Sequence, residues 1–195
     1  MITDNTPLIL ASASARRIEL MHREGFQPLI QPADIDETLP EGIGPRDAVL
    51  FLALKKALHA ATDAPAGSLV VGADTIVYKD GIIGKPRDRA DAEAILTRLA
   101  GTAHQVMTGV AVVQAGCRHS VAFCDVTDVY FKPYTVADLA AYLASDEPFD
   151  KAGAYAIQGY FSRYIDHIEG DYDNVVGLPV TRLKTVLAGF DNAVR

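Results

Sequence analysis

The sequence predicts an α/β protein. Segments in which apolar residues recur at helical spacing alternate along the chain with short runs of apolar or β-branched residues. The chain has 195 residues, of which 49% are hydrophobic, so it is long enough to bury a large core. No stretch has the composition of a flexible linker. We therefore expect one domain over residues 1–195, and any two lobes within it would share a continuous body.

The first half of the chain contains strand and helix patterns in turn. Pro45 at the first turn of a helix and the turn residues Lys79-Asp80-Gly81 mark two of the boundaries. The expected elements are a buried strand over 8–11, a helix after the serines that follow it, a helix from Pro45 to just before Pro65, a strand over 69–78, and a return strand over 82–84.

The second half begins with a helix over 91–100, which Gly101 would end as a C-terminal cap. Runs rich in β-branched and aromatic residues then predict a hairpin. Its strands would span 105–114 and 117–131, with the turn at Ala115-Gly116. The remaining expected elements are a helix capped by Thr135 and ending at Ala144, an irregular segment over 146–179 with one strand near 164–168, and a helix over 181–188.

Composition excludes several classes of protein. The net charge of −7 argues against a nucleic-acid partner, which requires a basic surface. No apolar run is long enough to cross a bilayer, and the N-terminus lacks the pattern of a signal peptide, so we expect no membrane partner. Cys117 and Cys124 form no CxxC motif, and Cys124 is expected in the core. These features favour a reducing cytoplasm.

The turn Ser12-Ala13-Ser14-Ala15-Arg16-Arg17 lies where the first strand leads into a helix. Free backbone N–H groups at a helix N-terminus favour an anion there. Guanidinium groups offer paired donors that suit phosphate oxygens. The turn therefore predicts a phosphate site, and the alternative is a serine-capped surface helix with solvated arginines.

The segment Gly72-Ala73-Asp74-Thr75 places a carboxylate in an otherwise apolar strand. Such a group is costly to bury unless it is paired, bound to a metal, or used in catalysis. The small residues Gly72 and Ala73 would allow a ligand to approach the backbone. Strand pairing would bring Lys85 into the same neighbourhood as Asp74. The alternative is that Asp74 only bonds a neighbouring turn.

Other candidate residues are spread along the chain. Asp36-Glu37 ends an extended segment, Lys56 lies on the inner side of the second helix, and Asp150-Lys151 precedes a stretch that contains Gln158. The amide of Gln158 can both donate and accept, so it could bind a base edge. His104 is expected to be a hydrogen-bonded structural residue. Phosphate-binding P-loop and dinucleotide motifs, metal-ligand histidine spacing and a G-x-S-x-G elbow are all absent from the sequence.

At these residues the chain resembles the Maf-like nucleoside triphosphate pyrophosphatases. The segments that carry the resemblance occur in order and at matching spacing over nearly the whole chain: Leu10–Arg17, Leu52–Ala57, Gly72–Thr75, Gly84–Arg87, Asp150–Tyr155, Ile157–Gly159 and Val175–Pro179. Ala15 departs from the pattern, because the family usually has proline there. Its replacement makes the turn less rigid but removes no phosphate donor.

The resemblance implies hydrolysis of a nucleoside triphosphate to the monophosphate and pyrophosphate. It implies an α/β fold, similar to inosine triphosphatases, in which helices flank a mixed twisted sheet with a deep central cleft. Asp74 would be the proton acceptor that activates water, and Glu37 and Asp74 would bind the divalent cation, Mg²⁺ or Mn²⁺. The residues expected to bind the triphosphate or support the turn around it are Ser12, Ser14, Arg16, Arg17, Lys56, Lys85 and Lys151.

The subgroup that prefers dTTP and UTP is the most similar one. Its Gly-x-Tyr-x-Ile-Gln-Gly pattern spans Gly153 to Gly159 here. The resemblance associates Arg16, Thr75 and Gln158 with substrate choice, and one glutamine amide can pair with the small edge of a pyrimidine. The alternative within the family is 7-methyl-GTP pyrophosphatase activity.

Two other functions use the same binding residues. One is a nucleotide-binding regulator of cell division without turnover, since the family name has been linked to septum formation. The other is a sugar-nucleotide enzyme, which would have to prefer a diphosphate sugar over a free triphosphate. The carboxylates of Glu37 and Asp74 favour an enzyme, because they weaken anion binding unless a metal or a water needs them. The sequence leaves the assembly open, with a homodimer as one option.

Overall fold

The computed structural model describes residues 6–145 and 147–192 and confirms the α/β class. Its chain forms two compact units. Unit 1 comprises the described residues up to Asp74, Thr108–Asp125, and those from Gly177 onward, and unit 2 comprises Thr75–Met107 and Val126–Val176. Each unit therefore draws on separate parts of the sequence.

The sheet is mixed, as expected. Strand β1 pairs in parallel with both β2 and β3, whereas β3 with β4 and β6 with β7 are antiparallel. The order is β2-β1-β3-β5-β6-β7, and β4 pairs with β3 outside this path. The strands are β1 (Leu8–Leu10), β2 (Leu29–Ile30), β3 (Leu69–Tyr78), β4 (Ile82–Ile83), β5 (Ala103–Gln114), β6 (Ser120–Phe131) and β7 (Ile165–Glu169).

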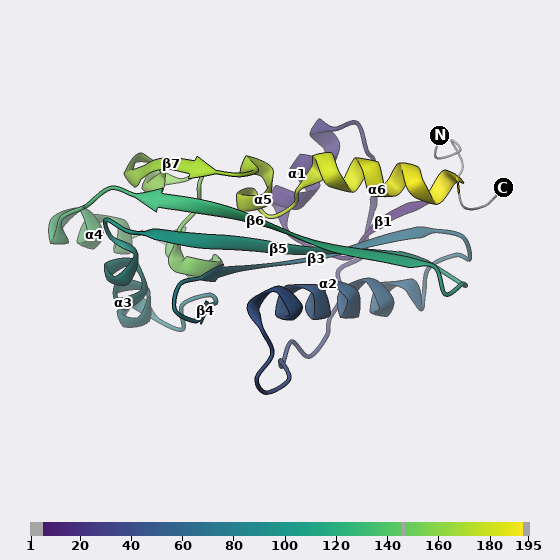
Figure 1. Cartoon of the computed structure of the whole chain (residues 1–195), viewed down its shortest axis with the longest axis horizontal. Helices are drawn as coiled ribbons and strands as arrows, with labels where there is room; N and C mark the ends of the chain where they lie inside the picture. Colours follow the sequence, from purple (N-terminus) through teal and green to yellow (C-terminus); the bar gives the residue numbers. More distant parts are fainter. Residues whose placement is uncertain (1–5, 146, 193–195) are drawn as a thin grey trace. The chain divides into compact units, whose positions relative to one another are not determined.

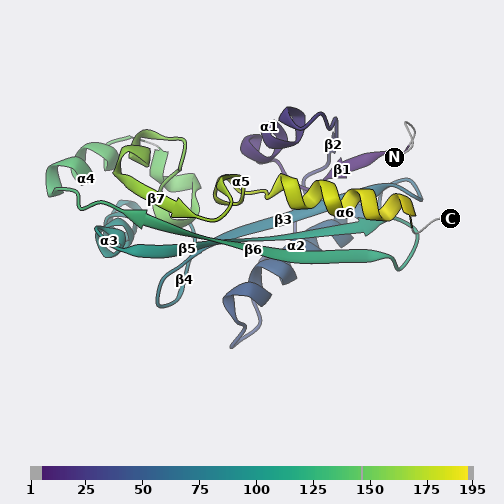
Figure 2. The same cartoon turned by 45° about the horizontal axis from the view of Figure 1, so that its top comes forward.

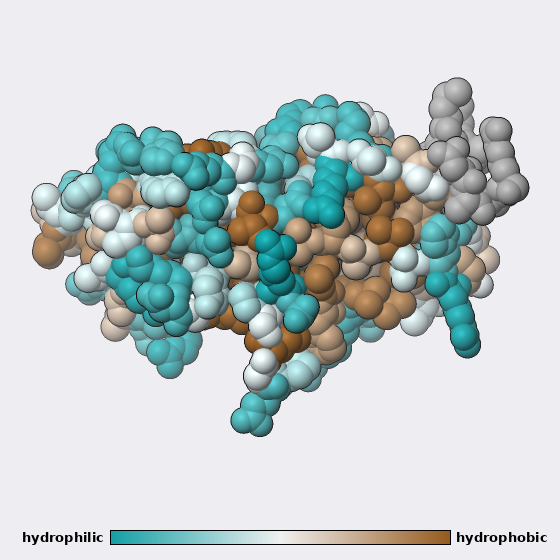
Figure 3. Space-filling model, viewed as in Figure 1, coloured by the Kyte–Doolittle hydropathy of each residue, from teal (hydrophilic) through white to brown (hydrophobic). Residues whose placement is uncertain are grey.

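Six α-helices and three short 3₁₀ segments are described (Figure 1). The helices are α1 (Ala15–Arg23), α2 (Pro45–Ala61), α3 (Arg89–Leu99), α4 (Val136–Leu143), α5 (Tyr172–Val176) and α6 (Val180–Asn192). The 3₁₀ segments are Glu147–Asp150, Ala152–Ala154 and Tyr160–Tyr164. None of the described helices is both long and apolar enough to span a membrane. Hydrophilic residues cover much of the face seen in Figure 3, with hydrophobic residues between them.

In unit 1, α2 packs closely against the sheet because small residues line the contact. Alanines of α2, among them Ala53 and Ala57, join Ile9 and Val70 in one buried cluster. A Cβ at Gly72 of β3 would lie 2.2 Å from the carbonyl oxygen of Ala53, far inside van der Waals contact. Gly72 therefore allows the helix backbone to approach β3, two residues before Asp74. Helix α6 lies on the other side of the sheet from α2 (Figure 1).

Unit 2 is built around its own apolar core. Val77 and Ile83 from the β3–β4 hairpin pack with Leu96 of α3, Tyr142 of α4 and Phe161. Helices α3 and α4 lie close together in both ribbon views (Figures 1 and 2). This core supports the irregular residues 147–164, whose side chains are candidates for substrate recognition.

Most expected boundaries are confirmed to within a few residues. Helix α2 begins at Pro45, and Thr135 caps α4 in a reciprocal capping box with Asp138. Helix α3 begins at Arg89, two residues early, because the Asp88 side chain accepts from the backbone N–H of Asp91. Strand β6 begins at Ser120 rather than at 117, so the hairpin turn is longer than expected.

Candidate active site

The candidate site of unit 1 is a lysine bound by two carboxylates. Lys56 Nζ lies 2.7 Å from Asp74 Oδ1 and 2.7 Å from Glu37 Oε1. The Lys56 and Asp74 side chains are only 11% and 13% exposed, whereas Glu37 is 58% exposed. Asp74 of β3 and Lys56 of α2 therefore form a buried, charge-assisted pair. The exposed Glu37 connects this pair to solvent.

Local structure explains how this pair forms. Asp74 lies in the interior of β3, and Lys56 lies on the buried face of α2. The close approach that Gly72 permits brings the two elements together. The sequence interpretation that Gly72 would admit a ligand is therefore wrong, because backbone atoms of α2 occupy that space. Lys56 is on the inner side of its helix, as expected.

The pKa of Asp74 reflects burial and the charges around it. Burial raises the pKa of Asp74 above its ordinary value, and the nearby charges of Lys56 and Arg17 act against this rise. The negative charge of Glu37 makes a smaller contribution, which also raises the pKa of Asp74. A carboxylate with a raised pKa holds a proton more strongly than an exposed aspartate, and it is more suited to accept one during a reaction.

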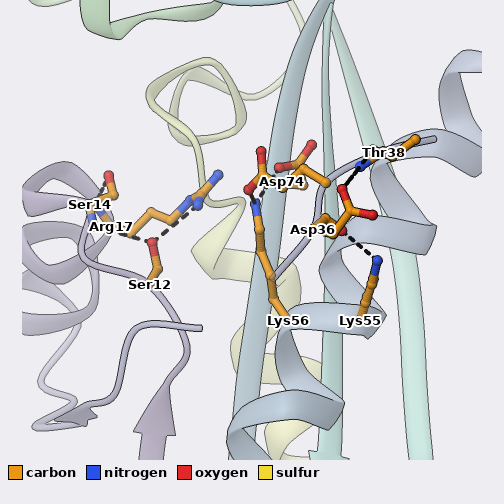
Figure 4. Close-up of polar contacts among 9 residues, drawn as sticks. Ser12, Ser14, Arg17, Asp36, Thr38, Lys55, Lys56 and Asp74 are labelled. Carbon is orange, nitrogen blue, oxygen red and sulfur yellow. Dashed lines mark hydrogen bonds and ion pairs between the residues drawn. The ribbon is translucent and has the colours of Figure 1, made fainter. Parts of the chain in front are cut away.

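The serine and arginine turn is organised largely by its own side chains. Ser14 caps α1 by accepting from the N–H of Arg17 at 3.5 Å, as the capped-helix alternative expects. Ser12 Oγ accepts from the N–H of Ser14 and from the Arg17 guanidinium, both at 3.2 Å. Arg17 Nε also donates to the carbonyl of Gly177 at 2.8 Å. Arg17 thus supports the turn while its side chain extends toward Lys56 and Asp74 (Figure 4).

Arg16 and Thr75 are two of the residues that the motifs associate with substrate choice. Arg16 lies in the first turn of α1 and is half-buried. Burial lowers the pKa of Arg17, and the positive charge of Arg16 makes a smaller contribution in the same direction. Thr75 follows Asp74 directly in β3 and is also half-buried. The turn therefore gathers two guanidinium groups in unit 1, whereas Thr75 is the first residue of unit 2.

Glu37 lies in a segment with no helix or strand between β2 and α2. Its neighbour Asp36 accepts from both the N–H and the hydroxyl of Thr38, at 2.9 and 2.6 Å. Lys55 Nζ donates to the carbonyl of Asp36 (Figure 4). These bonds fix the backbone around Glu37, and sequence reasoning missed both Lys55 and Thr38.

The remaining predicted lysines belong to unit 2. Lys85 is exposed, and with Gly84, Asp91 and Arg98 it lines a pocket of about 360 Å³ between the β3–β4 hairpin and α3. The β3–β4 ladder ends at Ile83, so it stops short of Lys85. Lys151 Nζ donates to the carbonyl of Glu147 at 2.6 Å and to the Asp150 carboxylate. Lys151 therefore binds its own segment in this structure.

Gln158 is exposed and lies in a turn. The next residues are held by Glu147, whose carboxylate oxygens accept from the N–H of Tyr160 at 3.0 and 3.2 Å. On the other side of the turn, the hydroxyl of buried Tyr155 is hydrogen-bonded to His104 Nε2 at 2.6 Å. The turn that presents Gln158 is thus anchored at both flanks.

His104 is a structural residue, as expected. It is 3% exposed and makes edge contacts with the rings of Phe131 and Tyr155. Burial lowers the pKa of His104 to about 3, and the charge of Lys79 contributes to the decrease. The imidazole is therefore neutral at physiological pH. Cys124, by contrast, is half-buried rather than in the core, so that expectation is wrong.

Gly153 connects two of the candidate segments within unit 2. Its N–H donates to the carbonyl of Gly84 at 3.1 Å, next to Lys85. Its φ is +74°, and a Cβ at this position would lie only 2.7 Å from Val77 Cγ2, so both the backbone conformation and the space require glycine. The segment that carries Gln158 and the turn that carries Lys85 therefore share a backbone hydrogen bond.

Comparison with known proteins agrees with these motifs. A family described as Maf-like protein matches residues 7–190. This chain belongs to the Maf-like family. The dTTP/UTP pyrophosphatase of Desulfitobacterium hafniense strain Y51 is 45% identical over 188 residues, which cover 93% of this chain and 84% of the relative. A protein of the same name from Alkaliphilus metalliredigens is 43% identical over 180 residues, covering 92% and 94%.

Solved structures place this Maf-like chain in a known fold. The Staphylococcus aureus Ham1 protein aligns with a TM-score of 0.51 at 13% identity, and the alignment covers 94% of this chain and 99% of that one. At this identity the similarity concerns the fold alone. It agrees with the mixed sheet and flanking helices described above.

Sequence reasoning on the Maf-like motifs missed the groups that support the candidate residues. Lys55 is adjacent to Lys56 in the sequence, and Asp36-Glu37-Thr38 has the spacing of an Asx turn, so local signals for both existed. Glu147 and the pairing of His104 with Tyr155 had no such signal. Those contacts join residues 13 and 51 positions apart, and only the folded chain brings them together.

Proposed function

We propose that this chain hydrolyses dTTP and UTP to the monophosphate and pyrophosphate. The observation that carries the proposal is the buried Lys56–Asp74 pair with Glu37 beside it, at 2.7 Å for both contacts. A site that only binds an anion gains nothing from two carboxylates, whereas phosphoryl chemistry needs a base and a counter-charge. The curated relatives named dTTP/UTP pyrophosphatase, at 43–45% identity, support the same choice.

In this proposal Asp74 accepts a proton from a water molecule. The water oxygen forms a bond to the α-phosphorus, and the bond from that phosphorus to the α–β bridging oxygen breaks. The electron pair of this bond leaves with pyrophosphate, and the water proton passes to Asp74. The raised pKa of Asp74 supports this role, since it makes the carboxylate a better proton acceptor.

Positive groups would neutralise the triphosphate. We assign Arg16 and Lys56 to phosphate oxygens, and Ser12, Ser14 and Arg17 to the turn that holds them. The capping and cross-bonding of this turn support that division. Lys85 and Lys151 are assigned to the same substrate on the basis of the family motifs. Each charge-assisted bond contributes on the order of 1.5–3 kcal/mol to binding.

The donor set fits a divalent cation of the Mg²⁺ type. Glu37 and Asp74 supply carboxylate oxygens within reach of one ammonium group, and Mg²⁺ is commonly bound by one or two carboxylates together with substrate phosphates and water. In the part of the chain that the structure describes, no group of three or more His, Cys, Asp or Glu side chains is arranged to hold a metal. A bound cation would neutralise charge on the phosphate oxygens.

Base selection is assigned to Arg16, Thr75 and Gln158. The position of Gln158 on a turn with anchored flanks supports a recognition role, because the residue is exposed while the backbone around it is fixed. Uracil and thymine offer one N–H donor flanked by carbonyl acceptors, which a glutamine amide can match. We place the reaction in the cytoplasm, where the free thiols of Cys117 and Cys124 would stay reduced.

A substrate panel tests the proposal. The protein is incubated with Mg²⁺ and dTTP, UTP, CTP, GTP, 7-methyl-GTP or UDP-glucose, and released pyrophosphate is measured for the triphosphates and released UMP for UDP-glucose. We expect the highest kcat/KM for dTTP and UTP. Preference for 7-methyl-GTP would assign the alternative activity. Tight binding of dTTP without turnover would indicate a nucleotide-binding regulator instead.

A further inference from the structure

Glu37 occupies an unusual position for a residue expected to bind a metal. The chain from Pro32 to Pro40 has no helix or strand, and the Glu37 side chain is 58% exposed, yet its carboxylate lies 2.7 Å from buried Lys56. Irregular segments of this length sample many conformations unless specific contacts restrain them. Specific contacts within unit 1 must therefore restrain the backbone around Glu37.

The segment begins at a fixed point. Gln31 donates its backbone N–H to Leu10 of β1 at 3.0 Å, and its side-chain amide donates to the carbonyl of Ala60 at 3.1 Å. This anchors the start of the segment to the sheet and to the C-terminal part of α2. Glu37 is six residues further along, so this anchor alone leaves its carboxylate free to move through several ångströms.

A second anchor lies directly beside Glu37. Two consecutive lysines of α2 contact two consecutive residues of the segment: Lys55 donates to the carbonyl of Asp36, and Lys56 pairs with the carboxylate of Glu37. The Asp36 carboxylate in turn accepts from the N–H and hydroxyl of Thr38. The backbone on both sides of Glu37 is therefore restrained (Figure 4).

We propose that Lys55 is a positioning residue that holds Asp36 so that the Glu37 carboxylate stays beside Lys56 and Asp74. Lys55 donates to the backbone carbonyl of Asp36, and it acts on Glu37 through that backbone. The inference rests on the proposed function, in which Glu37 helps to bind the divalent cation. Loss of the Lys55 ammonium should weaken cation binding while leaving Asp74 and Lys56 in place.

The test measures binding of Mn²⁺ by electron paramagnetic resonance in the presence of α,β-imido-dUTP, which the enzyme cannot cleave at the scissile position. Lys55→Met keeps most of the side-chain length and removes the donor, and Lys55→Arg restores one. Lys184→Met is the matched control, because it removes another lysine of unit 1 that bonds only Glu24 in the contacts described. We expect Lys55→Met to raise the Mn²⁺ dissociation constant by roughly 3- to 10-fold, in line with the net contribution of one typical hydrogen bond.

A second readout reports on the segment itself. Glutamate-specific protease cleaves after Glu37, and we expect Lys55→Met to be cleaved there several times faster than the wild type in the metal-free protein, because local opening is easier. Lys55→Arg should be close to the wild type in both measurements. If Lys55→Met is poorly folded, Thr38→Val provides a second variant, since it removes the hydroxyl that donates to Asp36.

The double variant Lys55→Met/Glu37→Gln separates this inference from the proposed function. If Lys55 acts through Glu37, adding Lys55→Met to Glu37→Gln should weaken Mn²⁺ binding no further. Wild-type Mn²⁺ affinity in Lys55→Met together with weak affinity in Glu37→Gln would refute the positioning role alone. Wild-type affinity in Glu37→Gln would refute the metal role of Glu37, and the inference would fall with it.

Discussion

The two units hold their candidate functional residues in different ways. In unit 1, Lys56 and Asp74 are buried and bound to each other. In unit 2, Lys85 and Gln158 are exposed on turns whose backbone is fixed by hydrogen bonds and by a buried aromatic core. A group that must accept a proton benefits from burial, which raises its pKa. A group that must contact a variable ligand edge has to remain accessible, so its precision comes from the backbone beneath it.

This difference suggests a division of function between the two units. The Lys56–Asp74 pair of unit 1 would supply the chemistry that is common to every nucleoside triphosphate, and Gln158 of unit 2 would choose among bases. Changes at Lys56 or Asp74 should then reduce the hydrolysis of all substrates together, whereas a change at Gln158 should alter the ratio between substrates.

The largest expected effect follows from Asp74→Asn. This change removes the proton acceptor while keeping the size of the side chain, and we expect kcat to fall by roughly two to four decades. Asp125→Asn is the matched control, because Asp125 is a carboxylate of unit 1 paired with Arg182. That control should keep wild-type turnover. Near wild-type activity of Asp74→Asn with an unchanged melting temperature would remove Asp74 from the mechanism.

Lys56→Met should have the next largest effect. It removes one charge-assisted contact to phosphate and the ammonium that lies between Glu37 and Asp74, so we expect kcat/KM to fall by about 10- to 100-fold. The pH dependence should change as well. Lys56 lowers the pKa of Asp74 against the effect of burial, and its loss should raise that pKa further.

The measurement for this variant is the pH profile of kcat/KM. In the wild type, activity should decline on the acid side at a pH above the ordinary aspartate pKa of 3.8. In Lys56→Met the same decline should occur at a higher pH. A decline that stays in place or moves to lower pH would show that another group limits the acid side.

A variant of His104, a buried structural residue of unit 2, tests how the core of that unit contributes to the pH dependence of stability. Its folded pKa of about 3 lies below the ordinary value of 6.5, so unfolding takes up a proton between these values and stability falls as the pH falls through this window. The expected loss approaches about 1.4 kcal/mol per pH unit below pH 6.5, and it amounts to about 1.6 kcal/mol between pH 6.5 and pH 5. His104→Gln should lose this part of the pH dependence in urea unfolding.

His22→Gln is the control for that experiment. His22 is an exposed histidine of α1, so this variant makes the same imidazole-to-amide change at the surface. A wild-type slope in His104→Gln would mean that another group takes up the proton. Because His104 is buried and hydrogen-bonded to Tyr155, and has no assigned role in the reaction, His104→Gln should affect kcat less than either Asp74→Asn or Lys56→Met.

How far the sequence predicts this molecule depends on the range of the interactions. Local patterns were sufficient for β3, for α2 and for the inner position of Lys56, because apolar spacing and a proline at the helix start act within a few residues. Local patterns were not sufficient for the role of Gly72. The small size of glycine allows either a ligand or a helix to approach the backbone of β3, and only the packed chain shows that α2 occupies the space beside Gly72.

The segment 147–164 shows the same limit more strongly. It was expected to be irregular, yet it contains three short 3₁₀ segments. Their positions depend on Glu147 bound to the N–H of Tyr160 and on Tyr155 bound to His104, neither of which follows a helical or strand period. Short α5 and β2 were missed for a related reason, since two to five residues carry too little periodicity to detect.

The division between the two units can be measured directly as the ratio of kcat/KM for UTP to that for CTP. In Asp74→Asn we expect both values to fall together and the ratio to stay at the wild-type value. In Gln158→Glu the new carboxylate cannot donate to a uracil carbonyl but can accept from the N4 amine of cytosine. We therefore expect the ratio to fall by about 10-fold, mostly through loss of UTP hydrolysis. A parallel loss for both nucleotides in Gln158→Glu, or a changed ratio in Asp74→Asn, would contradict the division.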